Sequence, residues 1–412
     1  MKLSIIKFTL FSLILTKALL LDKPQFFDMA NEAIYSNETG YGYDFNTKPQ
    51  SESNKNPAYF SIKVDDGNYK VTIEIGSNEF DANTTVRAEN RRLLIHNLIT
   101  KKGEFKKFTF VLHKRSPSIS NGKKVRLKPR ELSYLSWDDR LTFEFNGNAP
   151  AVRSLNIEPD NNAITLFLCG DSTVVEASGE PWASWGQMIT KWFDENICIA
   201  NHAESGLTTT TFMSQNRLEK VLDMAKPGDY IFVEFGHNDE KDKGSNAGAF
   251  LNYAENLKTF ITKSKNKGLN PIILSPTARR NFDGDKIKNT HGDYPEAARQ
   301  VAEKEGVPFI DLTQLTTDLY EAYGDTISTK LFVHYPAGVY SETELKDNTH
   351  FNPFGAYEVA KCVIFGLKHI DIPFIIHLRE EWKDFDPKNP DNWEDFIWVP
   401  APSVDSIKPD GD

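Results

Sequence analysis

The stretch ITLFLCGDST (164–173) decides the fold of this chain. Its apolar residues are almost continuous, which is typical of a strand that is buried on both faces of a parallel sheet. Four similar runs follow it: ICIAN (197–201), YIFVEFG (230–236), PIILSP (271–276) and VPFIDL (307–312). Helical patterns lie near 183–194, 214–225, 247–268 and 294–305. Residues 163–378 are therefore predicted to form a parallel α/β sheet with crossover helices.

Residues 22–160 have a different pattern. Stretches such as YKVTIEI (69–75), KVRL (124–127) and RLTFEF (140–145) alternate apolar and polar residues, and turn-forming pairs such as Asn121-Gly122 separate them. Many short strands between turns indicate an all-β sandwich, similar to a jelly roll. Two roles stay open for this domain, because it either binds a ligand or only supports the domain that follows.

The two ends of the chain are predicted to lie outside these domains. A basic start and a short apolar run, interrupted by Lys7 and Lys17, indicate a signal peptide over residues 1–21. The uninterrupted apolar part is shorter than the ~20 residues that a membrane span needs. We therefore expect a secreted, extracellular protein, or a periplasmic one in a bacterium, with no membrane association after cleavage. Residues 379–412 form an irregular tail rich in Trp, Pro and Asp, which we expect to pack in part on the surface.

Composition excludes several classes of protein. The chain has 412 residues, of which 39% are hydrophobic, and 48 basic against 58 acidic residues give a net charge of -10. This acidic balance argues against nucleic acid as a partner, because phosphates need a basic face. Three cysteines are too few for a disulfide scaffold, and their spacing matches no zinc site. No metal or other cofactor is expected.

Residues that can take part in catalysis or ligand binding follow the first three apolar runs. Ser172 comes directly after the first run, in a tight turn that begins at Gly170. Gly206 lies in the loop after the second run, where a backbone N–H without a side chain beside it can approach a ligand. Asn238 follows the third run and carries an amide donor. In an α/β sheet these positions meet at the carboxyl edge, where ligands bind.

A serine nucleophile needs a general base, and the base needs an orienting carboxylate. Among the histidines of the α/β region, only His350 has an aspartate three residues before it, Asp347, in a predicted loop that directly precedes a helix. Asn352 is typical of an N-cap and Pro353 of a first helical residue. The alternative is that Asp347 and His350 serve only loop structure, which leaves the motifs at the other strand ends unexplained.

Four sequence blocks together resemble the SGNH (GDSL) hydrolase superfamily: GDST (170–173), Gly206, GHND (236–239) and DNTH (347–350). The stretches EFGHND and DNTHFNP are most similar to rhamnogalacturonan acetylesterases of carbohydrate esterase family 12. The resemblance covers about 163–370. It implies an α/β fold, a flavodoxin-like three-layer α/β/α sandwich with five parallel strands. The stretches YFSIKV (59–64), TTVRAENRRL (84–93), KVRLKPRE (124–131) and WDDRLTFEFNG (137–147) also resemble the galactose-binding-like β-domain that precedes the hydrolase domain in some members.

The resemblance also implies the role of each matching residue. Ser172 is the nucleophile, His350 the general base and Asp347 the residue that orients it. The oxyanion hole is formed by the backbone N–H groups of Ser172 and Gly206 and by the side-chain amide of Asn238. The function implied is a secreted serine esterase that removes acetyl groups from rhamnogalacturonan, so the expected partner is acetylated plant cell-wall polysaccharide.

Two alternatives to this function stay open. One is an esterase acting on another acetylated glycan such as xylan, or on a lipid ester. The other is a carbohydrate-binding protein whose esterase centre is vestigial. In either case, the β-domain is a carbohydrate-binding module or a supporting domain.

Three further residues are predicted to contact the substrate. Trp182, which follows the nucleophile turn, is expected to stack on a sugar ring, whereas its neighbour Trp185 is as readily explained by the core. Arg279 and Arg280 follow the fourth apolar run and are expected to meet galacturonate carboxylates. The alternative for both arginines is an exposed, solvated basic pair.

Overall fold

The computed structural model describes residues 23–402, which form a β-sandwich, an α/β unit and an ordered part of the tail. The predicted signal peptide over 1–21 and residues 403–412 of the predicted tail lie outside the described residues. No helix within the described range is both long enough and apolar enough to span a membrane.

The α/β unit contains the five parallel strands predicted from the apolar runs. They are β10 (Ile164–Gly170), β11 (Ile197–Asn201), β12 (Tyr230–Glu234), β13 (Asn270–Leu274) and β16 (Phe309–Ile310). Their order in the sheet is β11-β10-β12-β13-β16, and every neighbouring pair is parallel. Because the first strand in sequence lies inside the sheet, the chain changes direction between β11 and β12. This is the predicted flavodoxin-like class.

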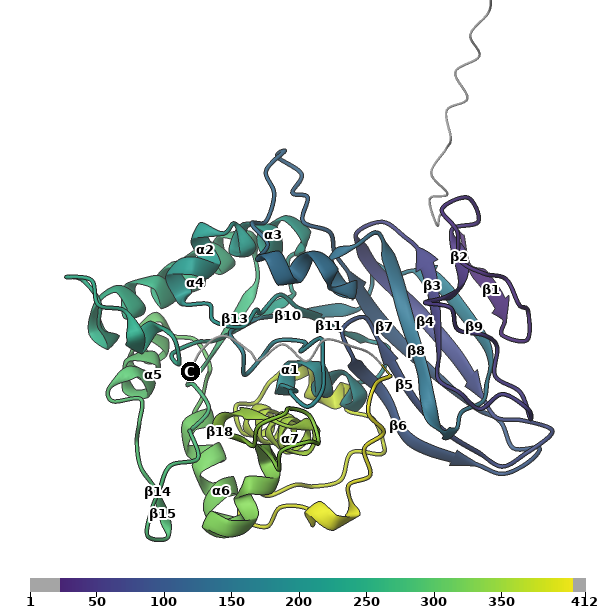
Figure 1. The fold of residues 1–412 in the computed structure, drawn as a ribbon. Coiled ribbons are helices and arrows are strands. Elements are labelled where there is room, and N and C mark those ends of the chain that lie inside the picture. The colour runs from purple at the N-terminus through teal and green to yellow at the C-terminus, as the bar shows by residue number, and fades with distance from the viewer. Residues whose placement is uncertain (1–22, 403–412) are drawn as a thin grey trace, which may run out of the picture.

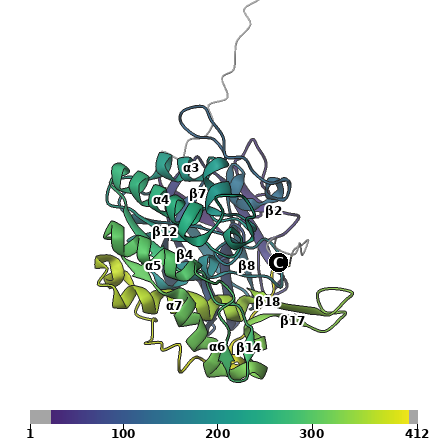
Figure 2. The same cartoon turned by 90° about the vertical axis from the view of Figure 1, so that its left-hand side faces the viewer.

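Helices cover both faces of this sheet (Figures 1 and 2). One layer holds α1 (Trp185–Met188), α6 (Leu312–Ser328) and α7 (Pro353–His369), and the other holds α2 (Thr209–Ser214), α3 (Arg217–Met224), α4 (Ala254–Lys267) and α5 (Tyr294–Glu305). Alternate strand residues enter the two layers: Leu168 packs toward the first and Phe167 toward the second. The sheet is therefore buried on both faces, as its apolar runs predict.

Helix α6 was not predicted, because its sequence is rich in threonine and contains Gly324. The structure shows that the Asp311 side chain accepts a hydrogen bond from the Gln314 N–H and so caps the helix. Gly324 has a φ of 70° and interrupts the helical backbone. The helix is stabilised by burial of side chains such as Leu319 and Tyr320 rather than by local propensity.

The β-sandwich consists of two antiparallel layers that enclose a core of their own. The first contains β1 (Gln25–Asp28), β9 (Val152–Pro159), β4 (Gly67–Ile75) and β7 (Lys106–Lys114), and the second contains β2 (Tyr41–Asp44), β3 (Ala58–Lys63), β8 (Arg140–Ala149), β5 (Ala82–Ala88) and β6 (Arg92–Thr100). In β4 the residues Val71 and Ile73 are fully buried, and Thr72 between them is not. This alternation is the reason the segment forms a sandwich.

Residues 124–127, predicted as a strand, are not in one. They belong to the segment 115–139, here called the β7–β8 segment, which contains the short helices η1 (Pro129–Ser133) and η2 (Leu135–Trp137). The segment leaves the sandwich and runs along the α/β unit, where the Arg126 N–H donates to the Gln215 carbonyl at 3.0 Å. Val125 is buried because it packs with Ile119 and Trp137 of the same segment.

The sandwich and the α/β unit share one sheet. Strand β7 pairs in parallel with β11, which places Leu112 beside Ile199 and produces a nine-stranded sheet (Figure 1). Near this junction the guanidinium group of Arg92 forms a buried ion pair with Glu176, 2.6 Å away, in the loop that follows Ser172. The sandwich is therefore attached directly to the segment that carries the predicted nucleophile.

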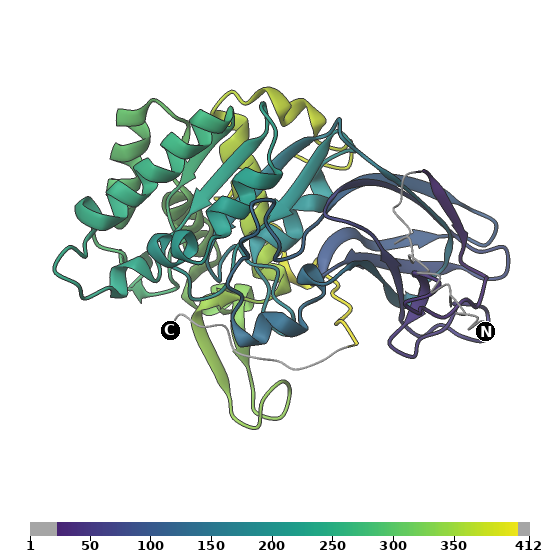
Figure 3. The ribbon, with the colours of Figure 1, turned by 90° about the horizontal axis from the view of Figure 1, so that it is seen from above.

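Further short elements surround the sheet. They are η3 (Ile189–Trp192), η4 (Asp239–Lys241), η5 (Ala249–Tyr253), η6 (Thr329–Leu331), η7 (Pro373–His377), η8 (Trp393–Asp395) and the hairpins β14 (Phe282–Asp283) with β15 (Lys286–Ile287) and β17 (Phe332–Tyr335) with β18 (Leu345–Phe351). The β17–β18 hairpin projects from the α/β unit (Figures 2 and 3). The part of the tail that is described returns to the sandwich, where the Trp398 ring stacks on Arg87 and its Nε1 donates to Glu180 at 2.9 Å.

Candidate active site

The first element of the site is the turn after β10. Ser172 lies two residues beyond Gly170, and only 3% of its surface is exposed. A Cβ atom on Gly170 would lie 2.4 Å from Val174 Cγ2 and 2.9 Å from the Glu234 carbonyl oxygen. Glycine is therefore required by close packing, and this packing brings the turn tightly against the end of β12.

The structure places His350 against Ser172. His350 Nε2 is 2.9 Å from Ser172 Oγ, and His350 Nδ1 is 2.8 Å from Asp347 Oδ2. In the tautomer that satisfies both contacts, Nδ1–H donates to the carboxylate and Nε2 accepts the serine proton. Both residues lie on strand β18 and not in the predicted loop, because residues 345–351 pair with β17. The helix after them begins as predicted, with Asn352 as N-cap and Pro353 as its first residue.

Asp347 is held as an anion. Its Oδ1 accepts the backbone N–H groups of Thr349 and His350, both at 2.8 Å. Burial alone would raise the pKa of Asp347, but the hydrogen bond and charge of His350 together with these two N–H donors bring the pKa below its ordinary value. A fixed carboxylate in this place orients the imidazole and stabilises it when it is protonated.

The other two predicted donors lie in loops that contact each other. Gly206 is in the turn from Glu204 to Leu207 and has a φ of 72°. The Glu204 N–H donates to the Gly170 carbonyl at 3.2 Å, so this turn lies beside the nucleophile turn. Asn238 follows β12, and its Nδ2 donates to the Leu207 carbonyl at 3.2 Å. An amide has two N–H donors, so this contact orients Asn238 and leaves a second donor for a ligand.

A buried acidic pair lies beneath the nucleophile. Thr173 Oγ1 is 3.0 Å from Asp171 Oδ1 and 3.0 Å from Glu234 Oε1, and Trp185 Nε1 donates to the second oxygen of Glu234. Burial and the nearby charge of Asp171 raise the pKa of Glu234 to about 8. A protonated Glu234 supplies the hydrogen that lets one hydroxyl bond both carboxyl groups. Sequence reasoning missed this residue, although a glutamate inside the apolar run YIFVEFG was a visible signal.

Comparison with known proteins identifies the family. Residues 168–356 match the GDSL-like lipase/acylhydrolase family. The rhamnogalacturonan acetylesterase RhgT of Bacillus subtilis is 37% identical over 226 residues, which are 52% of this chain and 94% of that protein. The chain belongs to the GDSL-like lipase/acylhydrolase family. It is accordingly a carboxylic ester hydrolase by family.

Two further proteins are similar to this chain. The probable rhamnogalacturonan acetylesterase YesY of Bacillus subtilis is 32% identical over 219 residues, which are 52% of this chain and 98% of that protein. Among solved structures, the YxiM protein of Bacillus subtilis covers 85% of this chain and 99% of its own, with 21% identity and a TM-score of 0.48.

Trp182 lies where the α/β unit of this GDSL-family chain meets the sandwich. Its side chain is packed in the core with Trp185, and only 5% of its surface is exposed. Its carbonyl oxygen accepts a hydrogen bond at 2.9 Å from Arg91 of the sandwich. Trp182 therefore belongs to the junction between the two regions, and its stacking on a sugar ring stays a prediction.

Arg279 and Arg280 both form ion pairs within the protein. The guanidinium group of Arg279 pairs with Glu240 at 2.5 Å, and that of Arg280 pairs with Asp325 at 2.5 Å. Each guanidinium group already has a carboxylate partner in the protein, partly buried for Arg279 and exposed for Arg280, and contact with galacturonate stays a prediction. Arg280 also supports the β18 strand, since its Nη1 donates to the Asn348 side chain at 3.1 Å and its backbone N–H donates to the Asn348 carbonyl at 2.9 Å.

Proposed function

We propose that this protein is a serine acetylesterase that removes acetyl groups from rhamnogalacturonan, a pectic polysaccharide, through an acetyl-enzyme on Ser172. The observation that carries the proposal is the continuous array of Ser172 Oγ, His350 and Asp347, with contacts of 2.9 and 2.8 Å. The names of the two Bacillus subtilis relatives, one of them described as probable, support the substrate class.

In the first half of the reaction, Ser172 Oγ attacks the carbonyl carbon of the acetyl group while His350 Nε2 takes the serine proton. The negative charge that develops on the carbonyl oxygen is met by the N–H groups of Ser172 and Gly206 and by the amide of Asn238. As the tetrahedral intermediate collapses, the C–O bond to the sugar breaks and the imidazolium returns its proton to the leaving sugar oxygen.

In the second half, water attacks the acetyl-enzyme. His350 takes a proton from this water, the same three donors meet the second oxyanion, and the bond to Ser172 Oγ breaks. The serine recovers its proton from His350 and acetate leaves. Asp347 remains an anion throughout and stabilises the imidazolium that forms in each half.

Burial of the nucleophile supports a small acyl group. Ser172 is 3% exposed and His350 is 2% exposed, so little of the nucleophile's surface is open to an approaching ester. An acetyl group meets this condition, whereas a long acyl chain needs a wide apolar groove beside the serine. The lipid-ester alternative is accordingly the less favoured one.

Acetate release from a panel of polymers tests the proposal. We expect release from acetylated rhamnogalacturonan that exceeds release from acetylated xylan and mannan at equal acetyl content. Preference for xylan would reassign the glycan and leave the mechanism in place. Absence of hydrolysis of every polymer and of p-nitrophenyl acetate would favour the vestigial, carbohydrate-binding alternative. Ser172→Ala is the control, and hydrolysis that survives in it would exclude the acetyl-enzyme.

We also propose that the protein is secreted, on the basis of the basic start and the short apolar run over residues 1–21. Expression with the full N-terminus, followed by mass spectrometry of the exported protein, tests this. A mature N-terminus close to residue 22 in the medium or periplasm is expected, and retention of residues 1–21 on a cytoplasmic protein would contradict it.

A further inference from the structure

Two cations of the β-sandwich contact the back of the peptide that carries the Gly206 N–H. The carbonyl oxygen of Ser205 accepts hydrogen bonds from Lys128 Nζ at 2.5 Å and from Arg130 Nη2 at 2.9 Å. Lys128 and Arg130 belong to the β7–β8 segment, more than 70 residues away in sequence. No sequence motif of the α/β unit includes them.

Planarity of the peptide connects this contact to the oxyanion hole. In a trans peptide the C=O of Ser205 and the N–H of Gly206 belong to one plane and point in opposite directions. The turn from Glu204 to Leu207 is closed by a 3.3 Å hydrogen bond, and Gly206 has a φ of 72°. Glycine at this position tolerates more than one orientation of the preceding peptide, so local sequence does not select one. In the structure the Ser205 carbonyl faces the two cations, so the Gly206 N–H is directed away from them.

Arg130 is itself held in place. Its Nε and Nη2 lie 2.8 and 2.6 Å from Glu204 Oε1, and Glu204 is 1% exposed. Burial and the nearby charge of Glu131 raise the pKa of Glu204 to about 7, and the charge of Arg130 opposes this rise and favours the carboxylate. The guanidinium group therefore bonds a side chain and a carbonyl on two consecutive residues of the turn.

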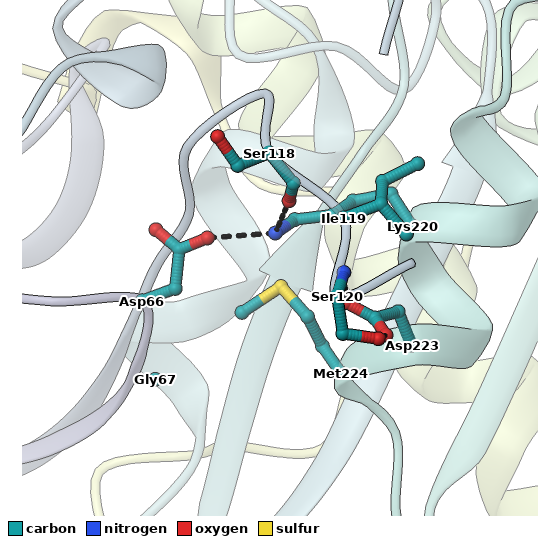
Figure 4. Close-up of a pocket in the computed structure, with 8 residues that line it drawn as sticks. All are labelled: Asp66, Gly67, Ser118, Ile119, Ser120, Lys220, Asp223 and Met224. Carbon is teal, nitrogen blue, oxygen red and sulfur yellow. Dashed lines mark hydrogen bonds and ion pairs between the residues drawn. The ribbon is translucent and has the colours of Figure 1, made fainter. Parts of the chain in front are cut away.

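The segment that presents both cations is attached to helix α3. At one end the Ser118 carbonyl and Asp66 both bond Lys220 Nζ, at 2.5 and 2.6 Å, and the Ser120 N–H donates to Asp223 at 3.0 Å (Figure 4). At the other end Glu131, next to Arg130, forms a fully buried ion pair with Arg217 at 2.5 Å. Contacts at both ends limit movement of the segment relative to the turn.

We propose that Lys128 and Arg130 are positioning residues of the esterase, which hold the Ser205–Gly206 peptide with its N–H directed at the oxyanion. Two positive charges on the carbonyl also polarise the peptide and strengthen its N–H as a donor. The inference rests on the proposed function, because Gly206 matters in this way only where an oxyanion forms. It makes the β-sandwich a functional part of the catalytic site.

Kinetics on p-nitrophenyl acetate test this inference. Arg130→Ala and Lys128→Met are each expected to lower kcat by about 10-fold to 100-fold with KM unchanged, because the N–H meets charge that exists only in the transition state. Loss of a whole oxyanion donor costs about 10²–10³ in kcat, so the double variant is expected to lose no more than this factor. Arg130→Lys keeps a positive charge at position 130 and is expected to recover part of the kcat that Arg130→Ala loses.

Lys123→Met is the matched control. Lys123 lies in the same segment, but it is exposed and its ammonium pairs with half-buried Glu219 on α3 at 3.0 Å. The kcat of Lys123→Met is expected to equal that of the wild type. A full kcat in Arg130→Ala and Lys128→Met, or a change confined to KM, would overturn the inference while the esterase proposal stands. Thermal unfolding of each variant, with midpoints close to the wild type, excludes loss of folded protein as the cause.

The crystal structure of the Lys128→Met, Arg130→Ala double variant gives a test that does not depend on activity. We expect the 205–206 peptide to be rotated or to occupy two orientations. An unchanged single orientation would overturn the inference even if the wild type hydrolysed no ester, which is the separate result that would remove the proposed function.

Discussion

The α/β unit and the β-sandwich contribute to the candidate site in different ways. The α/β unit supplies every group that is proposed to meet the acetyl ester, from turns and strands at one edge of its parallel sheet. The sandwich supplies groups that contact those turns from behind: Arg91 at the Trp182 carbonyl, Arg92 at Glu176, and Arg130 at Glu204. The reacting atoms and the charges that hold them in place therefore come from separate parts of the chain.

This division bears on the role of the sandwich, for which ligand binding and support were both open. A detachable binding module contacts its neighbour through a linker and a small polar interface. Here β7 continues the catalytic sheet by pairing with β11, and the ion pair of Arg92 with Glu176 is buried between the two regions. Such contacts support the α/β unit and cover what would otherwise be an exposed sheet edge, while ligand binding by the sandwich stays a prediction.

The largest expected effect is the loss of kcat when a proposed triad residue of the α/β unit is replaced. His350→Ala is expected to lower kcat on the order of 10⁴ or more, because it removes the imidazole nitrogen that contacts Ser172 Oγ and is proposed to take its proton. Asp347→Ala is expected to lower kcat less than His350→Ala does, since aspartate orients the base and transfers no proton. Both variants should unfold near the wild-type temperature, as measured by calorimetry. A kcat for His350→Ala above a tenth of the wild type would refute the assignment.

Substitution at the junction between the sandwich and the α/β unit is expected to lower the unfolding free energy instead. Arg92→Ala leaves Glu176 buried without its partner, and breaking such a pair costs about 3–5 kcal/mol of unfolding free energy. Lys101→Ala removes an exposed pair with Asp81 on the same sandwich and is expected to cost below about 1 kcal/mol. Denaturant unfolding compares the two. Equal costs would mean that the buried ion pair does not attach the sandwich to the α/β unit.

A smaller effect sharpens the assignment of the oxyanion donors. Asn238→Ala is expected to lower kcat by about 10²–10³ with little change in KM, because the amide meets charge that develops only in the transition state. Steady-state kinetics on p-nitrophenyl acetate measure both constants. If only KM rises, Asn238 positions the substrate and is not an oxyanion donor.

The smallest effect is expected in the pH dependence of the sandwich. Burial, with a contribution from the charge of Asp138, raises the pKa of Glu89, in the β5–β6 turn, to about 8. The folded protein thus keeps a proton that the unfolded chain releases above its lower pKa. The stability from this group is present at acidic pH and is lost as pH rises toward 8, by at most about 1.4 kcal/mol per pH unit.

Glu89→Gln removes this titration. The unfolding free energy of the variant should therefore improve relative to the wild type between pH 6 and pH 9, as followed by urea unfolding at each pH. Exposed Glu79→Gln is the control and should keep the wild-type slope. A constant difference between Glu89→Gln and the wild type across this range would show that Glu89 is already ionised.

Local patterns in the sequence were sufficient for the architecture and for placing Ser172, Asp347 and His350 as candidates. These signals depend only on residues that are close in sequence. Examples are an apolar run, a capping asparagine before a proline, and an aspartate three residues before a histidine. The alternating strands of the sandwich were predicted for the same reason. The pattern over 124–127 misled, because it lies in a segment whose hydrogen-bond partners are on another domain.

Tertiary structure alone decided which charges are available and which side chains are covered. The sequence places Arg279 and Arg280 at the right sheet edge, but the acids that pair with them come from residues 39 and 45 positions away. Likewise the contact of Arg130 with Ser205 spans 75 positions. Electrostatic pairing and burial depend on distance in space, which the sequence alone does not state. Patterns along the chain determined the elements and the reacting residues, and long-range packing determined how those residues are held.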